Sequence, residues 1–490
     1  MDDGATIIEL MNEAGYDVAT LGNHEFDYGM ARAKAVLKEA DFPYVSCNWV
    51  DLRTGLRVLP AVKLFPAGGK WIAFVGITTP ESFTKSTPAY FMNAKQTKYI
   101  YDILGGDDGR KLYDAVQKAI DKAKTLGADI IIGLGHLGVD PSSSPWTSEE
   151  VIANTTGFDA FIDGHSHTVM ENKQVYDAAG KAVTLTQTGS YLANVGKMTI
   201  AEDGAITTEL ISTADVSDAA VAATAEAWIN DVDAMLGEQI ATTDIKFYIN
   251  DPATSKRRIR MGETNLGDFV ADGIYTYFNE IEELHCDVAI MNGGGIRTDV
   301  DAGKWTFKTC KQVSPFGNVA CLMAVTGQQI QDALEFGARF VGPEGKENGG
   351  FLHVAGATYE IHTDIPNTVL TDDKNVWMGS ATGTPRVQNV RIYDRKTGTY
   401  EPLDLNRTYA LAGMNYTLRN LGDGFAMFDG AELIKDYVAE DYLVMSTYAM
   451  IFDAVNDMPV LSSANSPLAS YPGYLLNYEN PYGAGRIQVV

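Results

Sequence analysis

Residues 18–29 read VATLGNHEFDYG, a short apolar segment that runs directly into a dense group of polar side chains. The segment VATL predicts a strand, and Asn23, His24, Glu25 and Asp27 follow it almost at once. Ligand and catalytic groups of α/β proteins collect beyond the carboxyl ends of their strands. We therefore expect the polar group that begins at Asn23 to be part of a functional site.

Two further predicted strands end in histidine. IIIGLG at 130–135 runs into His136, and AFID at 160–163 runs into the segment GHSH at 164–167. Strand ends at one edge of a sheet can converge in space. Imidazole suits zinc, manganese, iron or nickel, and the Asn23 amide can add a neutral oxygen ligand. The three strand ends together predict a metal site.

His24 and Asp27 are three residues apart, so the carboxylate can accept a hydrogen bond from the imidazole ring. Such a contact fixes the tautomer of the ring and stabilises its protonated form. We therefore interpret His24 as an acid/base group rather than as a metal ligand.

Length, charge and hydropathy restrict the class of protein. A chain of 490 residues is too long for one hydrophobic core, so two or three domains are expected. The formal net charge of −26 argues against nonspecific binding to nucleic acid or to anionic lipid. No apolar run is long enough for a membrane span, and the segment after Met1 lacks the pattern of a secretory signal.

The four cysteines lie far apart and have no metal-type spacing, which indicates small buried residues rather than a disulfide framework. They are Cys47, Cys286, Cys310 and Cys321. On this evidence the cellular compartment stays open.

Helices and strands alternate in the first half, which predicts a layered α/β domain. Helices are expected over 4–15 and 111–127, and strands over 70–79 and 128–135. The Ala-rich stretch at 217–240 predicts a linking helix.

A second mixed α/β segment follows, with strands expected at 287–292, 357–362 and 407–413. We divide the chain into residues 1–212, a linker at 213–240, and residues 241–490. The segments EGKENGG (344–350) and TDDKNVWMGSATGTP (371–385) are expected to be exposed loops.

Six motifs give the chain a resemblance to a known family. The motifs are GNHEFDYG (22–29), GHLGVD (135–140), GHSHT (164–168), NGGGIR (292–297), SPFGN (314–318) and LGDGFAMF (421–428). The first three resemble the calcineurin-like metallophosphoesterase motifs of the secreted 5′-nucleotidase and UDP-sugar hydrolase family. The last three resemble signatures of that family's C-terminal domain, so the resemblance spans nearly the whole chain.

The resemblance implies an α/β fold: a layered α/β-sandwich metallophosphoesterase domain, then a mixed α+β substrate-binding domain. It implies two divalent metal ions, most readily zinc or manganese. Asn23, His136 and His165 would bind one ion and His167 the other. His24 and Asp27 would form a catalytic dyad at the phosphoryl group. The family's setting implies an extracytoplasmic protein.

In the second half the resemblance assigns substrate contacts. Arg260, Asn292 and Arg297 would hold phosphate, and a Gly triplet beside Arg297 suits anion binding. Phe316 would be one of two aromatic residues that clamp a nucleobase. The spacing before Gly-Asp-Gly is one residue longer than usual, and we choose Tyr416 as the other. These assignments make nucleotides the expected partners.

Further residues complete the interpretation of the second half. Asp423 matches a position near the ribose. Arg257 and Arg258 are interpreted as solvated surface charges. The histidines that match no motif are expected to be structural; they are His285, His353 and His362.

Two family motifs are not found in the chain: an Asp-x-His on the first strand, and a Gly-Asp whose carboxylate bridges the metals. Asp163 has the spacing of Asp-x-His, but His165 is already assigned and Asp163 is expected to end a strand. We therefore expect a metallophosphoesterase domain that lacks its first strands, in a fragment or a degenerate relative. Activity of the chain is expected to be weak or absent.

Hydrolysis of nucleotide phosphate esters is the expected function, from nucleoside 5′-monophosphate to nucleoside and phosphate, with UDP-sugars as further candidate substrates. Two alternatives stay open. One is a 2′,3′-cyclic-nucleotide 2′-phosphodiesterase/3′-nucleotidase, and the other is a noncatalytic nucleotide-binding relative. The metal, the preferred base and the oligomeric state are not determined by the sequence.

Overall fold

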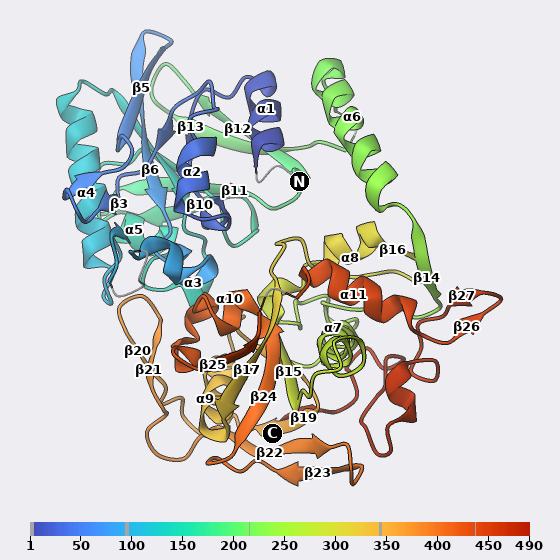
Figure 1. Cartoon of the computed structure of the whole chain (residues 1–490). Coiled ribbons are helices and arrows are strands. Elements are labelled where there is room, and N and C mark those ends of the chain that lie inside the picture. The colour runs from blue at the N-terminus through green and yellow to red at the C-terminus, as the bar shows by residue number, and fades with distance from the viewer. Residues whose placement is uncertain (1–3, 94–97, 215, 343–344, 437) are drawn as a thin grey trace. The chain divides into compact units, whose positions relative to one another are not determined.

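A six-stranded sheet organises the first half of the chain (Figure 1). Its order is β10-β11-β9-β8-β6-β5, and the four inner strands run parallel. The strands are β5 (Val62–Ala67), β6 (Lys70–Thr78), β8 (Ile130–His136), β9 (Ala160–Asp163), β10 (Val169–Tyr176) and β11 (Ala182–Thr188). Because β6, β8 and β9 are parallel neighbours, their carboxyl ends meet at one edge of this sheet.

The computed structural model describes residues 4–93, 98–214, 216–342, 345–436 and 438–490. The chain forms two compact units, Met1–Trp228 with Asp373–Asn375, and Ile229–Asp372 with Val376–Val490. Each unit is described by itself below.

Helix α4 (Arg110–Thr125) covers one face of the first sheet and packs along β6 (Figure 1). Its buried residues include Leu112, Val116, Ala119 and Ala123, which recur at the spacing of one helix face. The helix ends just before Gly127, whose φ of 86° is left-handed and therefore suits glycine. This confirms the helix predicted from the sequence.

A smaller aromatic core anchors the segment that carries Asn23 and His24. Phe26 is fully buried, with its ring centroid 5.3 Å from Trp49 and 5.0 Å from Phe91. Because Phe26 belongs to the same 3₁₀ turn as His24 (His24–Phe26), its burial fixes the position of this turn and of Asn23, which precedes it.

The remaining elements of the first unit surround this core and the six-stranded sheet. They are α1 (Ala5–Ala14), β1 (Ala19–Thr20), α2 (Met30–Val36), β2 (Tyr44–Val45), β3 (Trp49–Asp51), β4 (Leu56–Arg57), α3 (Ser82–Lys85), β7 (Tyr101–Ile103), α5 (Ser148–Ala153), β12 (Asn194–Ile200) and β13 (Ile206–Ser212).

Helix α6 (Ala219–Leu236) is the Ala-rich helix expected from the sequence. None of its described side chains is buried, and the division between the two units falls within it, after Trp228. Every helix in the described part of the chain falls short of the length and hydropathy that a membrane span requires.

The second unit is built on two sheets. The larger has the order β18-β15-β24-β17-β25, and the smaller has the order β23-β22-β19-β28. Helix α7 (Asn265–Thr276) packs along β15 and β18 and is buried on all sides. The strands of the two sheets are β15 (Val288–Asn292), β17 (Ala320–Thr326), β18 (Leu352–Ala355), β19 (Ala357–Ile361), β22 (Val387–Asp394), β23 (Thr399–Pro402), β24 (Thr408–Met414), β25 (Glu432–Lys435) and β28 (Ile487–Val489).

Shorter elements complete the second unit. They are β14 (Gln239–Thr243), β16 (Gly303–Thr306), α8 (Phe307–Val313), α9 (Gly327–Ala338), β20 (Leu370–Thr371), β21 (Trp377–Gly379), α10 (Asn415–Leu418), α11 (Asp441–Met450), β26 (Ala454–Val455) and β27 (Met458–Pro459).

A buried ion pair ties the C-terminal segment to α7. The Arg486 guanidinium donates to Asp272 at 2.8 Å, and both side chains are fully buried. The hydroxyls of Tyr474 and Tyr478 also donate to Asp272, each at 2.7 Å. The lone pairs of Asp272 are therefore satisfied inside the core, as a buried charge requires.

The expected α/β fold class is confirmed. The prediction that two segments are exposed loops is wrong. In the segment EGKENGG, of which Glu344 lies outside the described residues, Asn348 is buried and donates to Gly337 O at 2.7 Å. In TDDKNVWMGSATGTP, part of a short β20–β21 hairpin forms and Val376 is buried. The Asn348 hydrogen bond joins residues 11 positions apart, and Val376 is an apolar residue beside a turn. The composition of the two segments does not reveal either feature.

Candidate active site

Three strand ends of the first unit bring Asn23, His136 and His165 together. The Asn23 Oδ1 atom lies 3.2 Å from His136 Nε2 and 3.1 Å from His165 Nδ1. The two imidazole centroids are 5.1 Å apart, and Asn23 is 3% exposed. One amide oxygen and two imidazole nitrogens therefore converge at the edge of the sheet.

Close backbone approach shapes this cluster. A Cβ atom on Gly22 would lie 2.9 Å from both Cε1 and Nε2 of His136. Any residue larger than glycine would therefore clash with the imidazole ring. His165 and His167 have φ values of 78° and 56°, a left-handed conformation that is costly for residues other than glycine. Strained backbone of this kind often marks a functional segment.

The His136 ring is held neutral. Burial lowers the pKa of His136 well below its usual range, and the neighbouring His165, His24 and His167 lower it further. A neutral imidazole is the form that binds a metal ion.

His24 and Asp27 lie in contact, with 2.7 Å between His24 Nδ1 and Asp27 Oδ2. The His24 side chain is 44% exposed, whereas that of Asp27 is 16% exposed. The ring is therefore oriented by a more buried carboxylate while its other edge can meet solvent.

The three converging side chains offer one set of metal donors. Asn23, His136 and His165 offer an oxygen and two nitrogens, which suit zinc or manganese. His167 is exposed and lies close enough to His136 to influence its pKa. Across the described ranges, no group of three or more His, Cys, Asp or Glu side chains has an arrangement that could hold a metal. That His167 binds a second metal stays a prediction.

Glu81 joins this cluster, although the sequence analysis did not select it. It follows β6, and its Oε2 atom lies 2.9 Å from His165 Nε2. Burial raises the pKa of Glu81, but the contacts with His165 and Ser143 outweigh it, so the pKa falls to about 2. The signal that could have revealed Glu81 is its place after a further parallel strand of the sheet.

Asp163 has a structural role, as expected. Its Oδ1 atom accepts a hydrogen bond from Leu137 N at 2.9 Å, and the side chain is buried at the end of β9.

In the second unit, Asn292, Tyr416 and Asp423 form a connected group. Asn292 Nδ2 donates to Asp423 Oδ2 at 2.9 Å, and Asp423 N donates to Tyr416 Oη at 3.0 Å. The Tyr416 ring packs on Gly422, where a Cβ atom would lie 2.5 Å from the ring. Residues from three separate segments therefore meet at one place.

The predicted arginines lie close to this group. The Arg297 guanidinium lies 5.5 Å from the Phe316 ring centroid, and its Nη1 donates to Gly294 O at 3.3 Å. Burial lowers the pKa of Arg260 to about 10; the positive charges of Arg257 and Arg297 lower it further, while Asp423 opposes this. A Cβ atom on Gly293 would lie 3.4 Å from Arg260 Cα, so the Arg260 backbone lies beside the Gly triplet.

The interpretation of Arg257 and Arg258 as solvated charges is wrong. Arg257 Nη1 lies 3.1 Å from Glu347 Oε2, and Arg260 Nη1 lies 3.8 Å from the same atom. Arg258 Nε donates to Glu263 O at 2.7 Å, and its guanidinium lies 4.8 Å from the Tyr482 ring centroid. Both arginines are half-buried because partners far along the chain fold over them.

The histidines outside the motifs have internal contacts. Imidazole nitrogens of His285, His353 and His362 lie 3.0 Å from Asp287, 2.9 Å from Ile259 O and 3.1 Å from Glu360, respectively. The four cysteines are free and buried, as expected.

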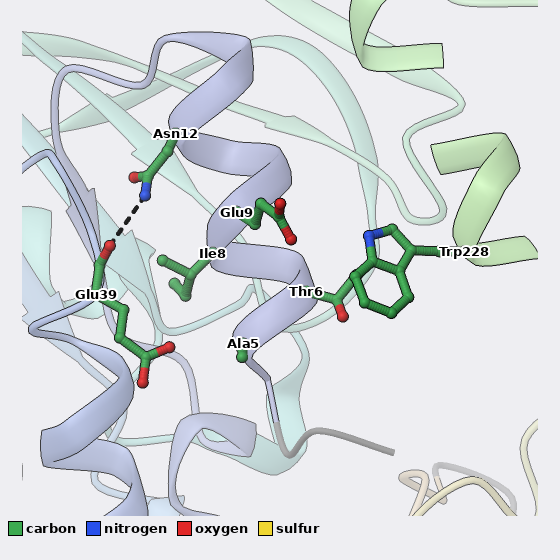
Figure 2. Close-up of a pocket in the computed structure, with 7 residues that line it drawn as sticks. All are labelled: Ala5, Thr6, Ile8, Glu9, Asn12, Glu39 and Trp228. Atoms are coloured by element: carbon green, nitrogen blue, oxygen red, sulfur yellow. Dashed lines mark hydrogen bonds between the residues drawn. The ribbon is translucent and has the colours of Figure 1, made fainter. Parts of the chain in front are cut away.

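A hollow of about 450 Å³ lies along α1 of the first unit (Figure 2). Figure 2 shows Asn12 on α1 donating to the main-chain oxygen of Glu39 at 2.9 Å, with the Trp228 ring facing Thr6. The lining residues are Ala5, Thr6, Ile8, Glu9, Asn12, Glu39 and Trp228. None of them is a predicted site residue, so this hollow does not mark the active site.

Comparison with known proteins agrees with the motifs. Residues 239–430 match the family model of the 5′-nucleotidase C-terminal domain. A 5′-nucleotidase of Rattus norvegicus is 28% identical over 97% of this chain and 81% of its own length. The trifunctional nucleotide phosphoesterase protein YfkN of Bacillus subtilis is 27% identical over 91% of this chain and 30% of its own length.

Among solved structures, a 5′-nucleotidase precursor from Thermus thermophilus has the same fold, with a TM-score of 0.76. It is 24% identical, and the match covers 100% of this chain and 87% of the other. The likeness therefore extends over both units of the chain.

Proposed function

We propose that the chain hydrolyses nucleoside 5′-monophosphates to nucleosides and phosphate, because residues 239–430 match the 5′-nucleotidase C-terminal domain and the chain is similar to 5′-nucleotidases over nearly its whole length. One observation carries the proposal: Asn23, His136 and His165 converge within 3.2 Å contacts beside the His24–Asp27 pair. Side chains of the type that binds metal thus lie next to a candidate acid/base group.

The proposed reaction depends on two divalent cations, zinc or manganese. Asn23, His136 and His165 would hold one of them, and His167 would contribute to the other. When bound, such ions lower the pKa of water and stabilise charge on phosphoryl oxygens. A water oxygen forms the new bond to phosphorus as the bond to the 5′ oxygen breaks. The water loses a proton to solvent, and the leaving oxygen takes a proton from His24.

Asp27 prepares His24 for this step. Its carboxylate accepts from Nδ1–H at 2.7 Å, so Nε2 is the atom that holds the transferable proton.

The second unit is proposed to supply recognition. Arg260 and Arg297 are positive groups for phosphate, and Asn292 and Asp423 are polar groups for phosphate and ribose. Phe316 and Tyr416 would each offer an aromatic ring on which a nucleobase could stack.

The test measures phosphate released from AMP by the complete gene product, with its metal content determined on the same sample. We expect His24→Ala to lower kcat by about a hundredfold or more, as the loss of a general acid does. His285→Ala is the matched control, since this exposed histidine pairs with Asp287 and has no proposed role. No phosphate release by the metal-loaded protein would overturn the proposal.

A substrate panel separates the related activities. AMP, UMP, a UDP-sugar, 3′-AMP and 2′,3′-cyclic AMP are compared by kcat/KM, because the similar Bacillus protein is named for three phosphoesterase activities. A preference for 2′,3′-cyclic AMP and 3′-AMP would favour the cyclic phosphodiesterase alternative. Nucleotide binding without turnover of any substrate would favour a noncatalytic binding protein.

We also propose an extracytoplasmic location, which rests on the family resemblance. Fractionation of the native cells tests it: activity released with the periplasmic, wall or medium fraction supports it, and activity confined to the cytosol contradicts it.

A further inference from the structure

Glu81 occupies an unusual position for a carboxylate. It lies in the turn after β6, immediately before α3, and is 5% exposed. Burying a carboxylate is costly unless charged or hydrogen-bonding partners compensate for it. The partners of Glu81 therefore indicate why the residue is inside the unit.

Two side-chain partners meet the same oxygen of this carboxylate. Glu81 Oε2 lies 2.9 Å from His165 Nε2 and accepts from the Ser143 hydroxyl at 2.5 Å. Ser143 is itself buried, so the hydroxyl and the carboxylate hold one another in place. The contact with His165 is thus made by a fixed group rather than by a mobile surface side chain.

The His165 ring spans two environments. Its Nε2 edge meets Glu81, whereas its Nδ1 edge lies 3.1 Å from Asn23 Oδ1, in the cluster with His136. When Nε2–H donates to the carboxylate, the lone pair of the neutral ring is on Nδ1. Nδ1 is the edge that faces the Asn23 oxygen.

We propose that Glu81 is a positioning residue that fixes the tautomer and orientation of His165, so that Nδ1 can bind the metal. Ser143 holds Glu81 in this role. A carboxylate on the far nitrogen of a histidine ligand raises the basicity of the ligand and orients its ring. The inference rests on the proposed function, because it requires a metal at Asn23, His136 and His165.

The test is metal affinity, measured on the complete gene product by calorimetric titration with Zn²⁺ and Mn²⁺. Glu81→Gln preserves the size of the side chain but replaces the charged acceptor with an amide. We expect a loss of affinity at the site of about 10–100-fold, the usual effect of removing such a partner. The visible spectrum of the Co²⁺-loaded protein should change as well.

Two variants separate positioning from a general effect on folding. Ser143→Ala leaves the carboxylate in place without its hydroxyl donor and should weaken metal binding less than Glu81→Gln does. Glu150→Gln is the matched control, because Glu150 lies in the same unit, caps α5, and its carboxylate accepts from Thr147 and Ser144. It should leave both the affinity and the Co²⁺ spectrum unchanged.

The results that would overturn the proposed function differ from those that would overturn the role of Glu81 alone. Wild-type protein that binds no divalent metal would overturn the proposed function and this inference together. Wild-type protein that binds metal, with Glu81→Gln binding it equally well, would overturn the role of Glu81 alone. An equal loss in Glu150→Gln would also overturn it, since the effect would then not be specific to the His165 contact. If Glu81→Gln fails to fold, an unchanged affinity in Ser143→Ala counts against the inference and a reduced one supports it.

Discussion

Protonation of His353 should destabilise the second unit at mildly acidic pH. This side chain is fully buried, and its Nε2–H donates to Ile259 O at 2.9 Å. Its Nδ1 atom has no hydrogen-bond partner in the described part of the chain and faces the backbone of α7, where a Cβ on Gly267 would lie 2.0 Å away. A proton on Nδ1 would therefore put a charge where nothing compensates for it.

The magnitude follows from the pKa. Burial is the main cause that lowers the pKa of His353 from 6.5 to about 4. The hydrogen bond to Ile259 O raises this pKa slightly, and the positive charges of Arg258 and Arg486 lower it slightly. At about 1.4 kcal/mol per pKa unit, this difference corresponds to about 3 kcal/mol. Because the folded-state pKa lies below the unfolded-state pKa, the stability is fully present above about pH 6.5 and is lost as the pH falls towards 4.

The assay is urea unfolding of the wild type and His353→Gln over this pH range. The transition of the second unit is followed by hydrogen exchange of peptides from β15 and β18. The glutamine amide can still donate to Ile259 O but does not titrate, so the other acidic transitions cancel in the difference. The free energy of unfolding of the wild type should fall by about 3 kcal/mol more than that of the variant. Parallel pH profiles for the two proteins would refute the reasoning.

Three other changes have defined outcomes. Gly22→Ala puts a Cβ atom 2.9 Å from the His136 ring and should displace the imidazole. Calorimetric titration should then show Mn²⁺ binding weakened more than about tenfold, and an unchanged affinity would show that the ring can move aside. Arg486→Ala leaves Asp272 buried without its cation, so the free energy of unfolding, measured by urea denaturation, should fall by about 3–5 kcal/mol. A loss below about 1 kcal/mol would contradict the importance of the ion pair. Arg260→Ala should raise KM for AMP at least about tenfold in steady-state kinetics, because it removes a positive charge from the proposed phosphate contact; an unchanged KM would exclude that contact.

The sequence indicated that three side chains of the first unit could converge, and they lie close together in the structure. Asn23, His136 and His165 each follow an apolar strand, and the ends of the parallel strands β8 and β9 meet at one edge. The distances of 3.1 and 3.2 Å to Asn23 follow from this topology together with the anchoring of Phe26. Periodicity does not give the strand order, which is known only from the folded chain.

Contacts that depend on distant loops could not be predicted. Glu81 follows the parallel strand β6, which marks its position, but the sequence does not show that its side chain turns inward to contact His165. In the same way, Glu347 reaches Arg257 across 90 positions of sequence, and neither residue has a local pattern that marks the pair. Burial of a charge depends on tertiary partners, which periodicity and spacing do not report.

The central claim is that this chain is a metal-dependent nucleotide phosphohydrolase whose metal donors include Asn23, His136 and His165. The most direct measurement strips the complete gene product of metal, restores Mn²⁺ or Zn²⁺ stepwise, and follows both bound metal and phosphate released from AMP. The account predicts that hydrolysis is absent from the stripped protein, rises in proportion to bound metal, and is lost with metal binding in His165→Ala. Hydrolysis that persists at full rate without metal, or metal binding and turnover that survive His165→Ala unchanged, would contradict it.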